Sequence, residues 1–344
     1  MRHASLLVTL LTLILAPSAP AADLSVGDTA PGFSIEEWVK GDEQTLQNGK
    51  VYLVEFFATD KGRLQRTVPM LSELQEEFGD RGLIVIGVSE QEADDVKRWA
   101  RSQGEKLGYT VAVDRRGVTT REWMSKAGRD TVPTAFIVDR KSKIAYIGDT
   151  LSEELATILE KVLRGRFAPT LDRQARQKLD AARRHRRVKS WRMAKQRYDE
   201  IIDLDPSVFA EVALERFEMM LVDMADRDEA YRYLQNELMA KRFVKDPEAL
   251  KDIAEKITLD RKITPENRDL DVALEAATAL HQLAGKADWR SLTTLALVHF
   301  HRQEFQQAIG LQYRAWKLAR PKYKAELKRV LRSYQVAARR GAVE

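Results

Sequence analysis

The spacing of hydrophobic positions changes once within a single short stretch of this chain. Val51 to Phe57 is an apolar, β-prone run that only Glu55 interrupts. Beyond a polar turn, apolar residues recur at the intervals of one helix face, at Leu64, Val68, Leu71, Leu74 and Phe78. The pattern predicts a strand that leads directly into a helix, with free backbone N–H groups at the junction.

Strand and helix patterns continue to alternate up to about residue 165. Leu83 to Val88 is a continuous apolar run, which is typical of a strand buried on both faces. Residues 90–103 have a helical pattern, residues 109–113 and 134–138 read as strands, and residues 144–147 read as the partner of the last strand. Such alternation predicts an α/β domain with a mixed sheet flanked by helices.

The rest of the chain, from about Thr170, has no strand pattern and reads as helix throughout. Two segments share a small residue, an aromatic residue nine positions later and an alanine three positions after that: Ala182, Trp191 and Ala194, and then Ala296, Phe305 and Ala308. These spacings resemble tetratricopeptide (TPR) repeats, in which small residues let antiparallel helices pack closely. Residues 247–265 fit the period poorly, so a generic helical bundle is the alternative.

The first 22 residues have the pattern of a secretory signal. Arg2 and His3 precede an apolar run from Leu6 to Ala16, and the small residues Ala19-Pro20-Ala21 follow. We expect an exported protein, periplasmic or secreted, with cleavage near Ala21; an uncleaved anchor is the alternative. The predicted organisation is therefore a signal peptide at 1–22, an α/β domain at 23–166 and a TPR-like helical domain at 167–344.

The junction after the first strand resembles the active-site segment of the thioredoxin fold, in the exported TlpA-like and redoxin (AhpC/TSA) branch. That segment reads Ala-Thr-Trp-Cys-x-x-Cys, with a proline five residues later. Here Ala58, Thr59 and Pro69 match, whereas Lys61 and Leu64 stand at the two cysteine positions. The phrase Gly27 to Phe33 resembles the start of the redoxin N-terminal hairpin, and the resemblance covers residues 25–165.

The chain contains no cysteine. Thiol–disulfide exchange requires an attacking thiolate, and these residues supply none. We therefore interpret the chain as a non-catalytic protein- or peptide-binding or scaffolding module. The alternative is a thiol-disulfide oxidoreductase of the family type with lost or atypical activity, which leaves open whether the protein is an enzyme.

The resemblance also implies roles for residues around the junction. Pro133 stands at the family's cis-proline, so Val132, Pro133 and Thr134 are expected to bind an extended peptide. Glu55 occupies the position of the family's buried acid. Burial raises the pKa of a carboxyl unless a cation pairs with it, and Lys61 or Arg63 is the hypothesised partner.

The turn Asp60-Lys61-Gly62-Arg63 has two interpretations. Asp60 is suited to cap the following helix. Lys61 and Arg63, together with free N–H groups, would form a site for an anion or an acidic peptide. Alternatively, the segment is a solvated turn that remained after the cysteines were lost.

Charge composition adds one further candidate. Lys and Arg number 57 against 52 Asp and Glu, so the net charge of +5 is mild. The densest basic run contains Arg183, Arg184, Arg186 and Arg187. It would bind anionic headgroups or acidic partners, or else form the wet face of a helix. No stacking aromatics interleave the arginines, so nucleic acid is not expected. The scattered histidines and the absence of nucleotide motifs predict neither a metal nor a cofactor.

Overall fold

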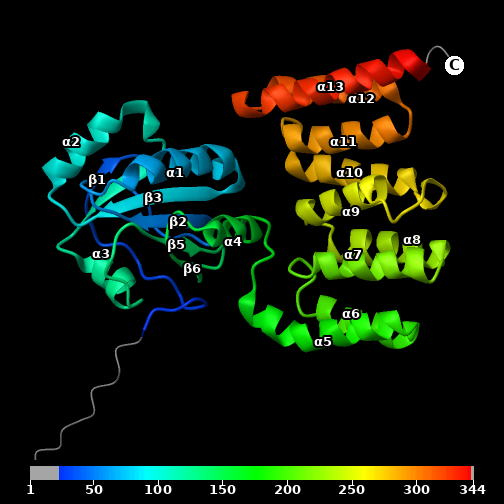
Figure 1. The fold of residues 1–344 in the computed structure, drawn as a ribbon, viewed down its shortest axis with the longest axis horizontal. Coiled ribbons are helices and arrows are strands. Elements are labelled where there is room, and N and C mark those ends of the chain that lie inside the picture. Colours follow the sequence, from blue (N-terminus) through cyan, green and yellow to red (C-terminus); the bar gives the residue numbers. More distant parts are fainter. Residues whose placement is uncertain (1–22, 342–344) are drawn as a thin grey trace, which may run out of the picture. The chain divides into compact units, whose positions relative to one another are not determined.

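The computed structural model describes residues 23–341, which form two compact units (Figure 1). The first unit extends to Leu159 and the second begins at Glu160, so the division falls within helix α4 (Glu153–Leu163). The sequence placed this boundary at residue 166. The expected signal peptide at 1–22 lies outside the described residues.

The first unit contains a six-stranded mixed sheet with strand order β1-β4-β3-β2-β5-β6. Its central strand β2 pairs in parallel with β3 and antiparallel with β5. This is the mixed sheet that the strand and helix patterns predicted, in the thioredoxin-like arrangement that the resemblance implied. The strands are β1 (Ile35–Lys40), β2 (Val51–Phe56), β3 (Leu83–Ser89), β4 (Thr110–Asp114), β5 (Thr134–Val138) and β6 (Ile144–Gly148).

All six residues of β2 are buried, because helices cover both faces of the sheet. The buried β2 carries a single charge, Glu55, whose neighbours across the strands are Gly87 on β3 and Ala135 on β5. The helices of this unit are α1 (Leu64–Phe78), α2 (Ala93–Gln103), the short α3 (Val118–Thr120) with a π-helical turn after it, and the first half of α4.

Aromatic side chains fill the core beneath the sheet. Trp123 is fully buried, and its ring stacks on Phe33 at 5.4 Å between centroids. Phe136 meets the same ring edge to face at 5.3 Å, and Phe56 lies at 6.1 Å. Because these rings come from the N-terminal segment, β2 and β5, they fix the ends of those elements against one another.

The N-terminal hairpin that the resemblance implied is not formed, because β1 does not pair with a neighbouring strand. Strand β1 pairs antiparallel with β4, far along the chain, with Trp38 opposite Ala112. Before β1, Thr29 forms an isolated bridge with Lys143 beside β6. The segment therefore lies along two different parts of the sheet and does not fold back on itself.

The second unit is helical throughout, and Figure 1 shows its helices stacked in successive layers from α5 to α13. The alanines of the repeated pattern, Ala182, Ala194, Ala296 and Ala308, are all fully buried, so neighbouring helices approach closely there. The helices are α5 (Pro169–Arg187), α6 (Trp191–Ile202), α7 (Ala210–Glu218), α8 (Arg227–Tyr233), α9 (Pro247–Leu259), α10 (Leu270–Ala284), α11 (Trp289–His301), α12 (Phe305–Leu318) and α13 (Pro321–Gly341).

Aspartates define where four of these helices begin. The side chains of Asp226, Asp246, Asp269 and Asp288 each accept a hydrogen bond from a backbone N–H in the first turn of α8, α9, α10 and α11. Such caps satisfy donors that a helix start would otherwise leave unpaired. Within residues 23–341, none of the helices combines the length and the apolar character needed to cross a bilayer.

Candidate functional site

The predicted site lies at one end of the sheet, where β2 and β5 meet. Phe56, the last residue of β2, pairs with Thr134, the first residue of β5. The turn that contains Lys61 follows β2, and the loop that contains Val132 and Pro133 precedes β5, so both lie at the same end of these two paired strands. The Val132–Pro133 peptide bond is cis, as the resemblance implied.

The turn between β2 and α1 is held by its own backbone. The N–H of Lys61 donates to Ala58 O, and the N–H of Leu64 donates to Lys61 O, both at 3.1 Å. As a result, α1 begins only at Leu64, with Arg63 at the capping position. The prediction that Asp60 caps this helix was wrong: its side chain is exposed and lies 4.0 Å from the Lys61 ammonium.

The two positions that the resemblance assigned to cysteines differ in exposure. Lys61 is exposed, and Leu64 is 5% exposed within the apolar core beside Val68 and Leu71. Gly62 lies exposed between them, with open space around it. A buried leucine thus stands at the position that the resemblance assigned to the second cysteine.

Arg63 already has a partner. Its Nη2 donates to both carboxylate oxygens of Asp149, at 2.6 and 2.5 Å, just beyond the end of β6. The hydrogen bond from Arg63 lowers the pKa of Asp149. The structure therefore neutralises one of the two cations that were expected to bind an anion, and leaves Lys61 exposed.

Glu55 is fully buried, and no cation of residues 23–341 pairs with it. Burial raises the pKa of its carboxyl from 4.5 to about 7, while the hydroxyls of Thr150 and Thr67 and the charge of Arg63 partly oppose this. Arg63 acts only at a distance because it pairs with Asp149. The hypothesised ion pair between Glu55 and Lys61 or Arg63 is therefore not formed.

The surroundings of Glu55 are polar but poorly satisfied. Thr67 Oγ1 donates to Glu55 Oε2 at a long 3.5 Å, and Glu55 Oε1 has no hydrogen-bond partner among the described residues. The hydroxyl of Tyr109 is likewise buried without a partner in residues 23–341. Burial and the negative charge of Glu55 raise the pKa of Tyr109 well above its ordinary value. Sequence reasoning missed Thr67, Tyr109 and Thr150, because only the fold brings these distant positions together.

A cavity in the first unit lies elsewhere. It measures about 660 Å³ and lies beside the N-terminal segment and β1, where Phe33, Trp38, Leu46 and Arg115 line it. None of the predicted site residues lines this cavity. Its walls contain no pair of groups suited to acid–base work.

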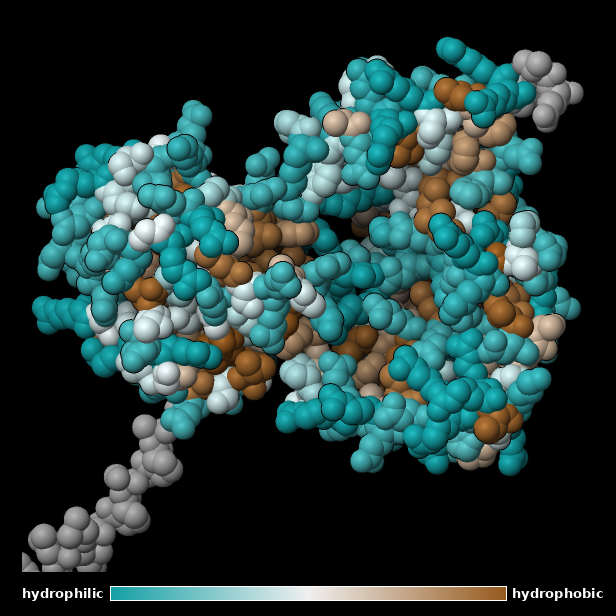
Figure 2. Space-filling view, in the orientation of Figure 1, coloured by the Kyte–Doolittle hydropathy of each residue, from teal (hydrophilic) through white to brown (hydrophobic). Residues whose placement is uncertain are grey.

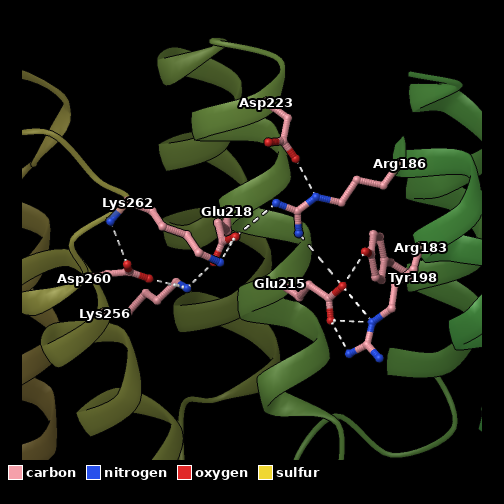
Figure 3. Close-up of polar contacts among 9 residues, drawn as sticks. All are labelled: Arg183, Arg186, Tyr198, Glu215, Glu218, Asp223, Lys256, Asp260 and Lys262. Carbon is pink, nitrogen blue, oxygen red and sulfur yellow. Dashed lines mark hydrogen bonds and ion pairs between the residues drawn. The ribbon is translucent and has the colours of Figure 1, made fainter. Parts of the chain in front are cut away.

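The second unit contains a network of opposite charges that links α5, α7 and α9 (Figure 3). Glu218 of α7 lies at its centre and accepts from Arg186 at 3.0 Å, Lys256 at 2.5 Å and Lys262 at 2.8 Å. Burial opposes ionisation of Glu218, but the three hydrogen bonds outweigh it and lower its pKa to about 2. Glu218 is therefore a permanent anion at neutral pH and not a proton donor.

The remaining members balance the network. Arg186 also pairs with Asp223, Lys256 pairs with Asp260 at 2.6 Å, and Arg183 pairs with Glu215 at 2.8 Å. Figure 3 labels four cations and four acids, which leave no net charge. A groove of about 790 Å³ is lined by much of this network. Because the charges of the network already have partners, we interpret it as a set of ion pairs that acts as a brace, holding α5, α7 and α9 together.

The structure divides the basic run that the sequence singled out. Arg183 and Arg186 are engaged in the network, whereas Arg184 and Arg187 are exposed. The proposed anionic partner surface through this run would thus rest on Arg184 and Arg187. Within the described residues, no group of three or more acidic or histidine side chains is placed to hold a metal ion.

Comparison with known proteins points to one family for the first unit. The model of the AhpC/TSA family matches residues 26–147. The chain is 30% identical over 156 residues to Protein FixW from Rhizobium leguminosarum, an alignment that covers 43% of this chain and 70% of FixW. It is 25% identical over 144 residues to the thiol-disulfide oxidoreductase ResA from Bacillus anthracis, covering 40% of this chain and 79% of ResA.

Solved structures give similar matches. The thiol:disulfide interchange protein, thioredoxin family protein, from Chlorobium tepidum aligns with a TM-score of 0.35 and 23% identity. That alignment covers 40% of this chain and 98% of the matched chain.

Proposed function

This chain belongs to the AhpC/TSA family through its first unit, and from that premise we propose that it is a member without thiol chemistry that binds proteins or peptides. The helical unit adds a second, TPR-like scaffolding surface. The observation that carries the proposal is the absence of any cysteine in a chain whose thioredoxin-like fold is intact. A redoxin reaction begins with a thiolate nucleophile, which these residues do not provide.

The peptide-binding surface would lie at the end of the sheet described above, where β2 ends and β5 begins. Val132 is half-buried and Thr131 beside it is exposed, so an extended peptide has access to this loop. Lys61 is exposed at the same edge and would favour acidic side chains in the peptide. Asp149 neutralises Arg63, so Arg63 would contact the peptide without adding net positive charge to the surface.

The alternative function is a thiol-disulfide oxidoreductase with atypical activity. Family membership favours it, as does the persistence of Glu55 as a buried acid with a pKa of about 7. Insulin reduction in the presence of dithiothreitol and the consumption of hydrogen peroxide distinguish the two functions. We expect the wild-type chain to match a boiled control in both assays.

A positive control is available within the chain itself. The double variant Lys61→Cys/Leu64→Cys restores both sulfurs on the existing turn, and we expect it to reduce insulin measurably. Activity of the wild-type chain above the boiled control would refute the non-catalytic proposal.

Peptide binding has its own test. Fluorescence anisotropy with labelled, reduced and alkylated insulin B chain measures affinity for an extended polypeptide. We expect Val132→Asp to weaken binding by roughly tenfold, which corresponds to about 1.4 kcal/mol. Lys141→Ala, in the exposed turn between β5 and β6, is the matched control and should bind as the wild type does. Equal affinity of the two variants, or no binding by the wild type, would contradict the proposed surface.

We also propose that the protein is exported, with residues 1–22 as a cleaved signal. The support is the order of a basic start, an apolar run and Ala19-Pro20-Ala21. Intact-mass measurement of the protein from its native host would locate the mature N-terminus. A mass that still includes Leu6 to Ala16 would contradict cleavage.

A further inference from the structure

The last two helices carry an unbalanced positive charge. Residues 305–341 contain ten Lys and Arg residues and one acid, Glu326, which is a net charge of +9. Because the full chain has a net charge of +5, all other residues together carry −4. The basic character of the protein is therefore concentrated in α12 and α13.

These cations share one side of the helix. At about 100° per residue, the seven Lys and Arg residues of α13 fall within an arc of about 160°. Lys324, Lys328 and Arg332 follow one another at intervals of four residues, and Lys328, Arg332 and Arg340 are exposed. Like charges four residues apart disfavour a helix by a few tenths of a kcal/mol per pair. In the space-filling view the visible surface of α13 is largely hydrophilic (Figure 2).

Two aromatic rings on α12 extend the same surface. The ammonium groups of Lys324 and Lys328 lie 5.8 and 6.0 Å from the Trp316 ring centre, so the two helices share this contact. Tyr313 is 43% exposed, its ring lies 5.7 Å from that of Trp316, and Lys317 lies over it at 5.1 Å. Aromatic rings with a polar edge next to long basic side chains are typical of the membrane–water interface.

The contrast with the run on α5 shows what this surface lacks. There, Arg183 and Arg186 meet acids from α7. On α12 and α13, Glu326 is the one acid, and it lies 4.0 Å from Arg329. The exposed side chains of Lys328, Arg332 and Arg340 are therefore available to a negatively charged partner.

We propose that the outer surface of α12 and α13, defined by Tyr313, Trp316, Lys328, Arg329, Arg332 and Arg340, docks on an anionic phospholipid bilayer. The apolar side of α13 is not free to insert, because Leu327, Leu331 and Tyr334 are buried. Attachment therefore rests on attraction between the basic side chains and the headgroups. Such attachment is reversible and weakens when salt screens it.

Sedimentation with vesicles tests this docking. The full chain is mixed with phosphatidylcholine vesicles that either contain or lack phosphatidylglycerol. We expect binding to the anionic vesicles alone, and its loss at high salt. Each cation near the surface contributes about fivefold to partitioning, so Lys328→Gln/Arg329→Gln/Arg332→Gln should bind about 100-fold more weakly.

A matched control removes the same number of exposed charges elsewhere. Arg101→Gln/Lys106→Gln/Lys141→Gln removes three exposed cations of the first unit and should bind within about threefold of the wild type, since these residues lie outside the proposed surface. Lys324→Arg/Lys328→Arg preserves charge and should also bind normally. Circular dichroism confirms that each variant is folded.

Three results would overturn the proposal. The first is equal binding to neutral and anionic vesicles. The second is an equal effect of the α13 triple variant and the triple variant of the first unit, which would indicate a response to net charge alone. The third is tighter binding to a short DNA duplex than to the anionic vesicles, which would assign the surface to nucleic acid.

Discussion

Replacing Glu55 by glutamine should stabilise the first unit, and increasingly so as the pH rises. The pKa of Glu55 is about 7 in the folded chain and 4.5 as an ordinary carboxyl. Because the folded pKa is the higher one, the native state binds the proton more tightly. The stability that Glu55 contributes is fully present below pH 4.5, and is lost as the pH rises through 7.

The magnitude follows from the difference between the two pKa values. Each unit corresponds to about 1.4 kcal/mol, so ionising Glu55 costs the fold about 3 kcal/mol above pH 7. The side chain is fully buried, so solvent does not screen this cost appreciably. Glu55→Gln resembles the protonated form at every pH. Its free energy of unfolding should match that of the wild type near pH 4 and exceed it by about 3 kcal/mol at pH 8.

The assay must report the first unit alone, because two units need not unfold together. Hydrogen exchange of peptides that span Val51–Phe56 gives the opening free energy of β2 at each pH. Glu76→Gln, at an exposed position on α1, is the matched control. A difference between Glu55→Gln and wild type that is constant from pH 4 to 8, or larger at acid pH, would refute the reasoning.

Three further changes test other contacts. Leu64→Ala should lower the free energy of unfolding by about 2–5 kcal/mol in urea titration, because it opens a cavity in the core; a loss under about 1 kcal/mol would contradict the buried position. Arg63→Ala should cost at most about 1 kcal/mol near pH 7 by thermal denaturation, since both partners are half-exposed. Its effect should vanish as acid protonates Asp149, whose pKa is lowered. Glu218→Ala should destabilise the helical unit by about 3–5 kcal/mol, because three cations lose their common partner. Hydrogen exchange of α7 and α9 would show this, and unchanged protection would exclude a brace.

Local periodicity predicted the parts of the fold that depend on neighbouring residues. The apolar run from Val51 to Phe57 located β2, and the spacing from Leu64 to Phe78 located α1. The burial of Glu55 was implied by the resemblance. The predicted start of α1 at Asp60 was wrong, and the reason is also local. Backbone hydrogen bonds of Lys61 and Leu64 close the turn, so the helix starts too late for Asp60 to cap it.

Contacts between distant residues could not be predicted in this way. The partner of Arg63 is Asp149, 86 positions away, and nothing in the local pattern of either residue indicates the pair. The same limit applies to Thr150 and Tyr109 around Glu55. The density of basic residues around Arg183 suggested a binding surface. The acids of α7 that neutralise part of this run are distant in sequence, so only the folded structure shows the pairs.

The buried Leu64 limits how thiols could be placed on this turn. A cysteine at 61 alone would be an exposed thiol without a second thiol to resolve a mixed disulfide. A cysteine at 64 alone would be enclosed among apolar side chains, where thiols are unreactive, and would leave a cavity behind. Neither substitution alone supplies the two thiols of a Cys-x-x-Cys turn, and the one at position 64 weakens the fold, so two thiols on this turn require both positions to change together.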